Sequence, residues 1–164
     1  MRIAMLTAFT LTCLMTVGAL AAPKSAHVAK YDLTAVSNAR FLADHARQKG
    51  VIVLPDGLQY RVIHKGHGKS IIGADDLVTV QYKGWLINGT VFDQTKPGDS
   101  VQFPAGRLIP GWVEALKHMR AGDEWELVIP AALGYGAEGA GAAIPPNQTL
   151  IFDMKLLAVT RSPL

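Results

Sequence analysis

The chain has a single cysteine, Cys13, and it lies in the first apolar run of the sequence. Once that run is removed no internal disulfide can form, so core packing alone must stabilise the domain. The mature chain then also lacks a cysteine nucleophile, and neither a G-x-S-x-G nor an H-E-x-x-H motif is present. These absences argue against a hydrolase.

An excess of charge of one sign is also missing. The 16 Lys and Arg residues against 13 Asp and Glu residues give a formal net charge of +3. No basic cluster accompanies that small excess, so the sequence does not indicate binding to nucleic acid. Hydrophobic residues make up 49% of the 164 residues and charged residues 18%, a balance typical of one globular domain.

Metal-ligating and acid–base residues are sparse as well. His64 and His67 lie close together without a third ligand nearby, so we expect solvated turn histidines and no metal site. The pairs Asp75-Asp76 and Asp123-Glu124 each precede an apolar alternating segment. We interpret them as solvated turn carboxylates and not as an acid–base couple.

The first 21 residues predict a signal peptide. Met1-Arg2 is followed by an uncharged apolar run over residues 3–20 and by Ala19-Leu20-Ala21, the small-x-small pattern that precedes cleavage. A retained membrane anchor is the alternative, but the small residues at the end of the run favour removal. We therefore expect an exported protein, periplasmic, outer-membrane associated or secreted in a Gram-negative bacterium, without stable membrane insertion after cleavage.

A helical segment is predicted over residues 22–50. Asp32 can cap a helix, and Gly50 is a typical residue to end one. The apolar stripe of this helix, which must rest on something, consists of Leu33, Val36, Phe41 and Leu42.

Residues 51–164 predict one α+β domain. Alternation of apolar and polar residues predicts strands over 58–63, 77–82, 124–129 and 149–159. Asn88-Gly89 predicts a hairpin with a type I′ turn. Pro110-Gly111 opens a helix whose apolar stripe is Trp112, Leu116 and Met119, and residues 134–146 form a loop rich in glycine and proline. The sum is a mostly antiparallel sheet packed on one helix.

Several separated motifs then resemble one family. They are Val91-Phe92-Asp93, Phe103-Pro104, Ile109-Pro110-Gly111-Trp112, Ile144-Pro145-Pro146-Asn147 and Leu150-Ile151-Phe152-Asp153. In this order they resemble the FK506-binding-protein family of peptidyl-prolyl cis-trans isomerases, over residues 57–159. Residues 41–60 resemble the bacterial exported subgroup that includes the macrophage infectivity potentiator.

The resemblance implies a twisted antiparallel sheet wrapped around one short helix, with the site between them. Trp112 would form the floor of the site, and Tyr82, Phe92 and Phe152 its apolar walls. The implied catalytic residues are Tyr82, Asp93 and Tyr135, and the implied substrate-binding residues are Phe92, Val101, Leu108, Ile109, Trp112, Ile144 and Phe152. We interpret Asp93 as an acceptor that orients Tyr82, with a structural turn carboxylate as the alternative.

The function that follows is isomerisation of X-Pro bonds without a cofactor. Implied partners are proline-containing exported proteins, macrolides similar to FK506 or rapamycin, and a second copy bound through the N-terminal helix, although residues 22–50 are shorter than the subgroup's dimerisation module. The sequence leaves open a non-catalytic chaperone or proline-peptide binding module, for which the helix stripe would supply extra contacts.

Overall fold

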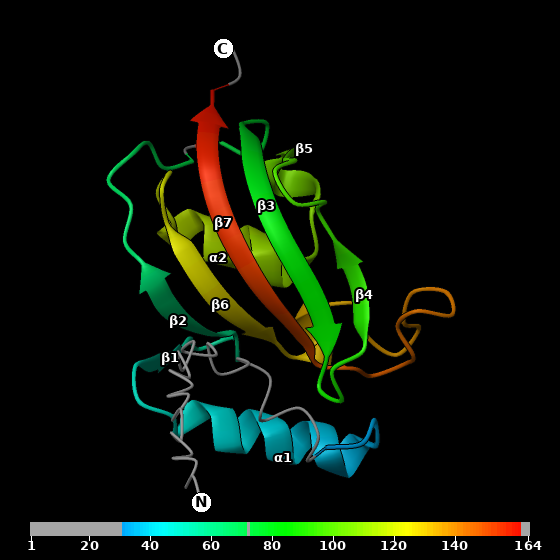
Figure 1. Ribbon diagram of the computed structural model, residues 1–164. Helices are drawn as coiled ribbons and strands as arrows, with labels where there is room; N and C mark the ends of the chain where they lie inside the picture. The colour runs from blue at the N-terminus through cyan, green and yellow to red at the C-terminus, as the bar shows by residue number, and fades with distance from the viewer. Residues whose placement is uncertain (1–30, 72, 162–164) are drawn as a thin grey trace, which may run out of the picture.

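The computed structural model describes residues 31–71 and 73–161 (Figure 1). The predicted signal peptide and Cys13 lie outside the described residues. Within the described part of the chain, no helix has the length and apolar content needed to cross a membrane.

One seven-stranded sheet organises the molecule, and the α+β prediction is confirmed. Its antiparallel strands run in the order β1-β2-β6-β7-β3-β4, and β5 pairs with β3 beyond the end of β4. The elements in chain order are α1 (Ala35–Ala46), β1 (Val51–Val53), β2 (Gln59–His64), β3 (Leu77–Leu86), β4 (Val91–Gln94), β5 (Val101–Pro104), η2 (Ala105–Arg107), α2 (Pro110–His118), β6 (Glu124–Ile129), η3 (Ala131–Leu133) and β7 (Leu150–Thr160).

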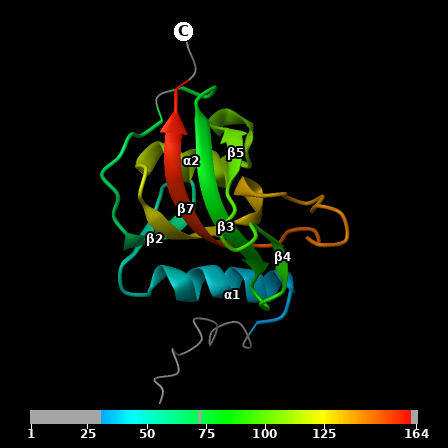
Figure 2. The same cartoon turned by 45° about the horizontal axis from the view of Figure 1, so that its top comes forward.

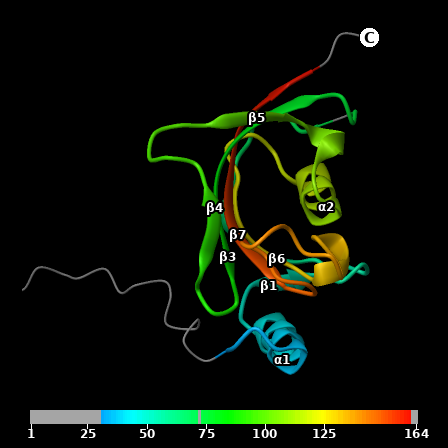
Figure 3. The ribbon, with the colours of Figure 1, turned by 90° about the vertical axis from the view of Figure 1, so that its right-hand side faces the viewer.

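The main core lies between the sheet and α2, which crosses its concave face (Figure 3). Because side chains alternate along a strand, every second residue of β7 points to this face. The predicted stripe of β7 is buried there, as are the predicted residues of α2; these residues are Leu150, Phe152, Met154, Leu156, Trp112, Leu116 and Met119.

A second apolar cluster lies on the opposite face. Val128 of β6 and Ile151 of β7 alternate with the core residues and are buried against α1 and the segment before it. Phe41 and Tyr31 supply the other side, with their rings edge to face at 5.2 Å. The N-terminal helix therefore packs on its own domain, at the end of the sheet away from the C-terminus (Figure 2).

Three details of the N-terminal helix differ from the sequence prediction. Thr34, and not Asp32, is the N-cap, because its hydroxyl accepts from Ser37 N while Asp32 accepts from Thr34. The helix ends at Ala46 with Arg47 as C-cap, and Gly50 instead takes its positive φ of 81° in the turn before β1. Val36 is 78% exposed, so it lies outside the buried stripe.

The Asn88-Gly89 hairpin between β3 and β4 is confirmed, but its predicted turn type is wrong. Gly89 has a positive φ of 90° and Asn88 does not, as a type I′ turn would require. Gly89 N donates to Leu86 O, and Asn88 Oδ1 accepts from Thr90 N. A three-residue loop with glycine in the left-handed position results.

Two carboxylates predicted to be solvated are buried. Asp123 accepts from Gly66 N at 2.6 Å and from Arg120 N at 2.7 Å, and Asp76 accepts from Gly73 N. Each binds the backbone amides of a turn, so the turn location was right and the exposure wrong.

Candidate functional site

A cavity of about 520 Å³ opens between the concave face of the sheet and the start of α2. Its size is that of a site for a small ligand or a short peptide segment. The lining residues are Tyr82, Phe92, Asp93, Phe103, Arg107, Leu108, Ile109, Trp112, Tyr135, Ala140, Ala143, Ile144 and Phe152. Strands, helix and loops all contribute, so the site needs the completed fold.

The rings in the cavity hold one another edge to face. Trp112, 4% exposed, lies between Tyr82 at 5.1 Å and Phe152 at 5.2 Å, measured between ring centroids. Phe92 meets Phe152 at 5.5 Å and an interplanar angle of 85°. Such mutual packing fixes the walls of the cavity and leaves an apolar surface for a ligand.

Gly84 makes the Phe92–Phe152 contact possible. It lies at an inward-facing position of β3, two residues after Tyr82, and a Cβ there would come within 2.7 Å of both rings. A side chain at this position would push one ring out of place.

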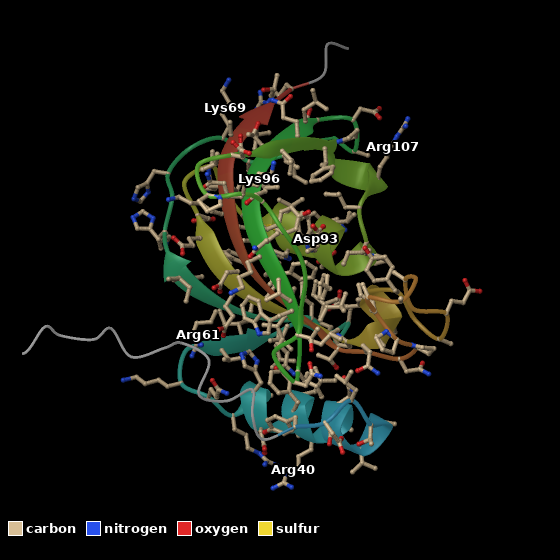
Figure 4. All side chains as sticks on the ribbon, turned by 45° about the vertical axis from the view of Figure 1, so that its right-hand side comes forward. Arg40, Arg61, Lys69, Asp93, Lys96 and Arg107 are labelled. Atoms are coloured by element: carbon tan, nitrogen blue, oxygen red, sulfur yellow. The ribbon has the colours of Figure 1, made fainter. Side chains whose placement is uncertain are left out.

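Asp93 and Tyr82 form the polar pair of the site. The Tyr82 hydroxyl donates to Asp93 Oδ2 at 2.5 Å, which is the contact expected from the sequence. Burial, and then the hydrogen bond to Asp93, raise the pKa of the Tyr82 hydroxyl, so the phenol stays protonated and keeps donating. Asp93 itself is exposed, on the edge strand β4 (Figure 4).

The turn before α2 brings a backbone donor to the cavity. Ile109 is the N-cap residue of α2, and Pro110 takes the first helical position, where its missing N–H is not needed. Within residues 31–71 and 73–161, no backbone or side-chain group accepts a hydrogen bond from Ile109 N. This amide is therefore free to donate to a ligand.

The loop between η3 and β7 forms the outer rim. Its backbone bonds across itself, with Ala140 N and Ile144 N each donating to the other residue's carbonyl and Asn147 N donating to Gly136 O. Ile144 is buried against the core, whereas Tyr135 is 41% exposed at the mouth. The rim is thus an ordered loop with one hydroxyl available to a ligand.

The structure brings together all the predicted site residues except Val101. Val101 of β5 pairs with Val80 of β3 and packs against the core, but it does not line the cavity. Phe103 lines the cavity and was named only as part of a family motif. Ala140 and Ala143 contribute a rim of small side chains.

Arg107 is the lining residue that sequence reasoning missed. It is exposed at the end of η2, next to the predicted Leu108 and Ile109, and that adjacency was the one available signal. Asp93 makes no ion pair with any described residue, so Tyr82 is its partner there.

No group of three or more His, Cys, Asp or Glu side chains suited to a metal occurs among the described residues. His64 was expected in a turn but is the last residue of β2; it is exposed, and its Nδ1 lies 3.1 Å from Gly122 O.

The sequence matches two family descriptions. Residues 68–157 match "FKBP-type peptidyl-prolyl cis-trans isomerase", and residues 14–62 match "Domain amino terminal to FKBP-type peptidyl-prolyl isomerase". The chain belongs to the FKBP-type peptidyl-prolyl cis-trans isomerase family, as its motifs predicted.

Individual relatives agree with this assignment. The chain is 44% identical over 131 residues to the FKBP-type 22 kDa peptidyl-prolyl cis-trans isomerase of Escherichia coli, covering 79% of this chain and 63% of the relative. It is 47% identical to the outer membrane protein MIP of Legionella longbeachae, covering 74% and 52%. The chain thus spans roughly half to two thirds of the length of such relatives.

Solved structures share the fold. The crystal structure of FkpA from Escherichia coli is 40% identical with a TM-score of 0.73, covering 78% of this chain and 60% of that one. A peptidyl-prolyl cis-trans isomerase from Pseudomonas syringae is 36% identical with a TM-score of 0.72, covering 77% and 92%.

Proposed function

We propose that the protein is a peptidyl-prolyl cis-trans isomerase that accelerates rotation about X-Pro bonds in exported proteins. The observation that carries this proposal is the ring-lined cavity with the Tyr82–Asp93 pair on one wall and the unpaired Ile109 amide at the helix start. Membership of the family supports the same activity.

The chemical task is to lower a rotation barrier of about 18–20 kcal/mol that arises from amide resonance. Water stabilises the charge-separated resonance form of the planar amide. A cavity lined by Trp112, Phe92 and Phe152 gives that form little solvation, so the twisted form, in which resonance is lost, becomes relatively easier to reach. No covalent intermediate is needed.

Each polar group has a holding role in this mechanism. The Ile109 N–H and the Tyr135 hydroxyl donate to substrate carbonyls on either side of the rotating bond. Trp112 receives the proline ring, which has no N–H to satisfy. Asp93 fixes the Tyr82 hydroxyl in place and does not act as a general base, since the reaction moves no proton.

Residues 1–21 are proposed to be a signal peptide, residues 22–50 an N-terminal helical segment and residues 51–164 the isomerase domain. The substrates would then be proline-containing proteins outside the cytoplasm, in the periplasm or at the outer membrane. The same cavity would accept macrolides similar to FK506, with the small side chains Ala140 and Ala143 giving a shallow rim.

The alternative of a non-catalytic binding module relied on an exposed stripe along the N-terminal helix. Phe41 is 6% exposed and Leu42 packs in the second cluster, so most of that stripe is occupied by the protein's own sheet. No observation favours this alternative over catalysis.

The test is an exchange or protease-coupled assay on a short X-Pro peptide with the folded mature protein. We expect an acceleration proportional to protein concentration and abolished by an FK506-like macrolide. A rate equal to the uncatalysed one, with the fold intact by circular dichroism, would refute catalysis.

A further inference from the structure

The N-terminal helix makes polar contacts at both of its ends, and only one end contacts the segment next to the loop that forms the rim of the cavity. Near its start, Asn38 contacts Gln148 and Thr149, which directly follow the rim loop. Near its end, His45 contacts Gln59 of β2 and Glu126 of β6, which carry no part of the rim. Figure 1 shows the start of α1 below the point where the loop enters β7.

Asn38 uses its whole side chain in this contact. Its Oδ1 accepts from Thr149 N at 2.7 Å, and its Nδ2 donates to Gln148 Oε1 at 3.1 Å and to Thr34 O at 3.0 Å. Asn38, Gln148 and Thr149 are 5%, 6% and 1% exposed. Water cannot replace these bonds easily at such burial, so each lost bond leaves an unsatisfied polar group.

Gln148 connects Asn38 to the end of the loop. Its Nε2 donates to Pro146 O at 2.9 Å and to Leu33 O at 3.1 Å, so one amide joins the loop end to the segment before α1. Two residues before Pro146 is Ile144, which is buried in the cavity wall. Asn147, which follows Pro146, has a positive φ of 59°, and its N–H donates to Gly136 O. This hydrogen bond joins the end of the loop to its beginning.

The residue type at position 38 adds a second argument. Asparagine is a poor residue for a helix interior, because its side chain competes for backbone hydrogen bonds. Here it lies within α1 at a buried position. The contact with the loop accounts for a polar side chain at this place.

We propose that Asn38 is a positioning residue for the substrate rim: acting through Gln148 and Thr149, it fixes the loop over residues 134–147 and so sets the affinity for substrate. This proposal rests on the proposed function for its kinetic consequence. Its structural consequence, order in the loop, is measurable without catalysis.

The test compares Asn38→Ala and Gln148→Ala with His45→Ala, a buried polar residue two turns further along the same helix. Both loop-side variants are expected to raise KM for an X-Pro peptide by about 3- to 10-fold with little change in kcat. Hydrogen exchange at the amides of Ala140, Ile144 and Asn147 should speed up by a similar factor. His45→Ala should lower the unfolding midpoint and leave KM and these amides as in the wild type.

The proposal is overturned if Asn38→Ala leaves KM and the loop amides unchanged, or if His45→Ala reproduces both effects at an equal loss of stability. Gln148→Ala keeps the test decisive if Asn38→Ala fails to fold, because it removes the same link from the loop side. A wild-type protein without isomerase activity would refute the proposed function alone, and the exchange rates would still decide the coupling.

Discussion

The two faces of the sheet are closed in different ways. On the concave face, α2 and the strands pack rings and aliphatic side chains and leave a cavity where the rings meet. On the opposite face, α1 covers a small apolar cluster and makes buried polar contacts near both of its ends. Incomplete packing on the concave face leaves a cavity that can bind a ligand. Close packing on the α1 face fixes the position of the helix.

The charge distribution follows the same division. A half-buried ion pair lies at the α1 end, where Arg61 (Figure 4) contacts Glu126 Oε1 at 2.6 Å. The same oxygen lies 3.2 Å from His45 Nε2. The cavity has the neutral Tyr82 hydroxyl against an exposed Asp93. Substitutions on the two faces should therefore separate activity from stability.

The largest expected effect comes from Trp112→Ala on the concave face. This side chain is both core and cavity floor, so its removal should lower the free energy of unfolding by about 3–5 kcal/mol and abolish catalysis. Urea denaturation and the peptide assay measure the two losses. Full activity in a folded Trp112→Ala protein would contradict the role of the floor.

On the α1 face, His45→Ala should affect stability alone. It leaves Gln59 Oε1 and part of Glu126 without a partner, which costs about 2–3 kcal/mol. The activity per folded molecule should remain that of the wild type. A loss of activity as large as the loss of stability would show that the two faces are not separable.

Tyr82→Phe and Asp93→Ala are expected to lower activity and leave stability nearly unchanged. Each removes the polar pair of the cavity, so kcat/KM should fall about tenfold, or about 1.4 kcal/mol in transition-state stabilisation. The free energy of unfolding should change by less than about 0.5 kcal/mol, because Asp93 is exposed and the Tyr82 ring is retained. Equal losses of stability and activity would assign the pair a structural role.

The smallest effect is a pH dependence confined to the α1 end. Burial alone would raise the pKa of Glu126, but the hydrogen bond from His45 and the charge of Arg61 outweigh it and hold the pKa below its ordinary value of 4.5. The stability that this carboxylate contributes is therefore present above pH 4.5 and is lost as the pH falls through the folded-state pKa.

Unfolding by urea between about pH 3 and pH 7 checks this sign. The difference in stability between the wild type and Glu126→Gln should be largest at neutral pH and shrink on acidification. Isomerase activity of the folded variant serves as the control, since Glu126 does not line the cavity. A difference that grew on acidification would contradict the assigned shift.

Periodicity made much of the sheet predictable. The long alternating runs of β6 and β7 and the stripe of α2 were identified because one face of each is uniformly apolar. β1 and β5 were missed because three or four residues are too few to display alternation. The burial of Asp76 and Asp123 was missed because a turn carboxylate has the same local sequence whether water or backbone amides surround it.

The site was predictable through its rings, whose motifs are widely separated and occur in a fixed order. Arg107 was not, because its place at the rim depends on the short η2 turn and not on a sequence period. The contact between Asn38 and Thr149 was also out of reach, because it joins residues 111 positions apart.

The position of β7 has a consequence for biogenesis. β7 lies between β6 and β3 and pairs with β3 along its whole length and with β6 over residues 150–155, although it is the last strand of the described residues to be synthesised. A nascent chain that ends before residue 150 has two separate sets of strands and no continuous sheet, so the complete sheet can form only after β7 has been synthesised. The sheet is therefore completed only when β7 is available to pair with both of its neighbours.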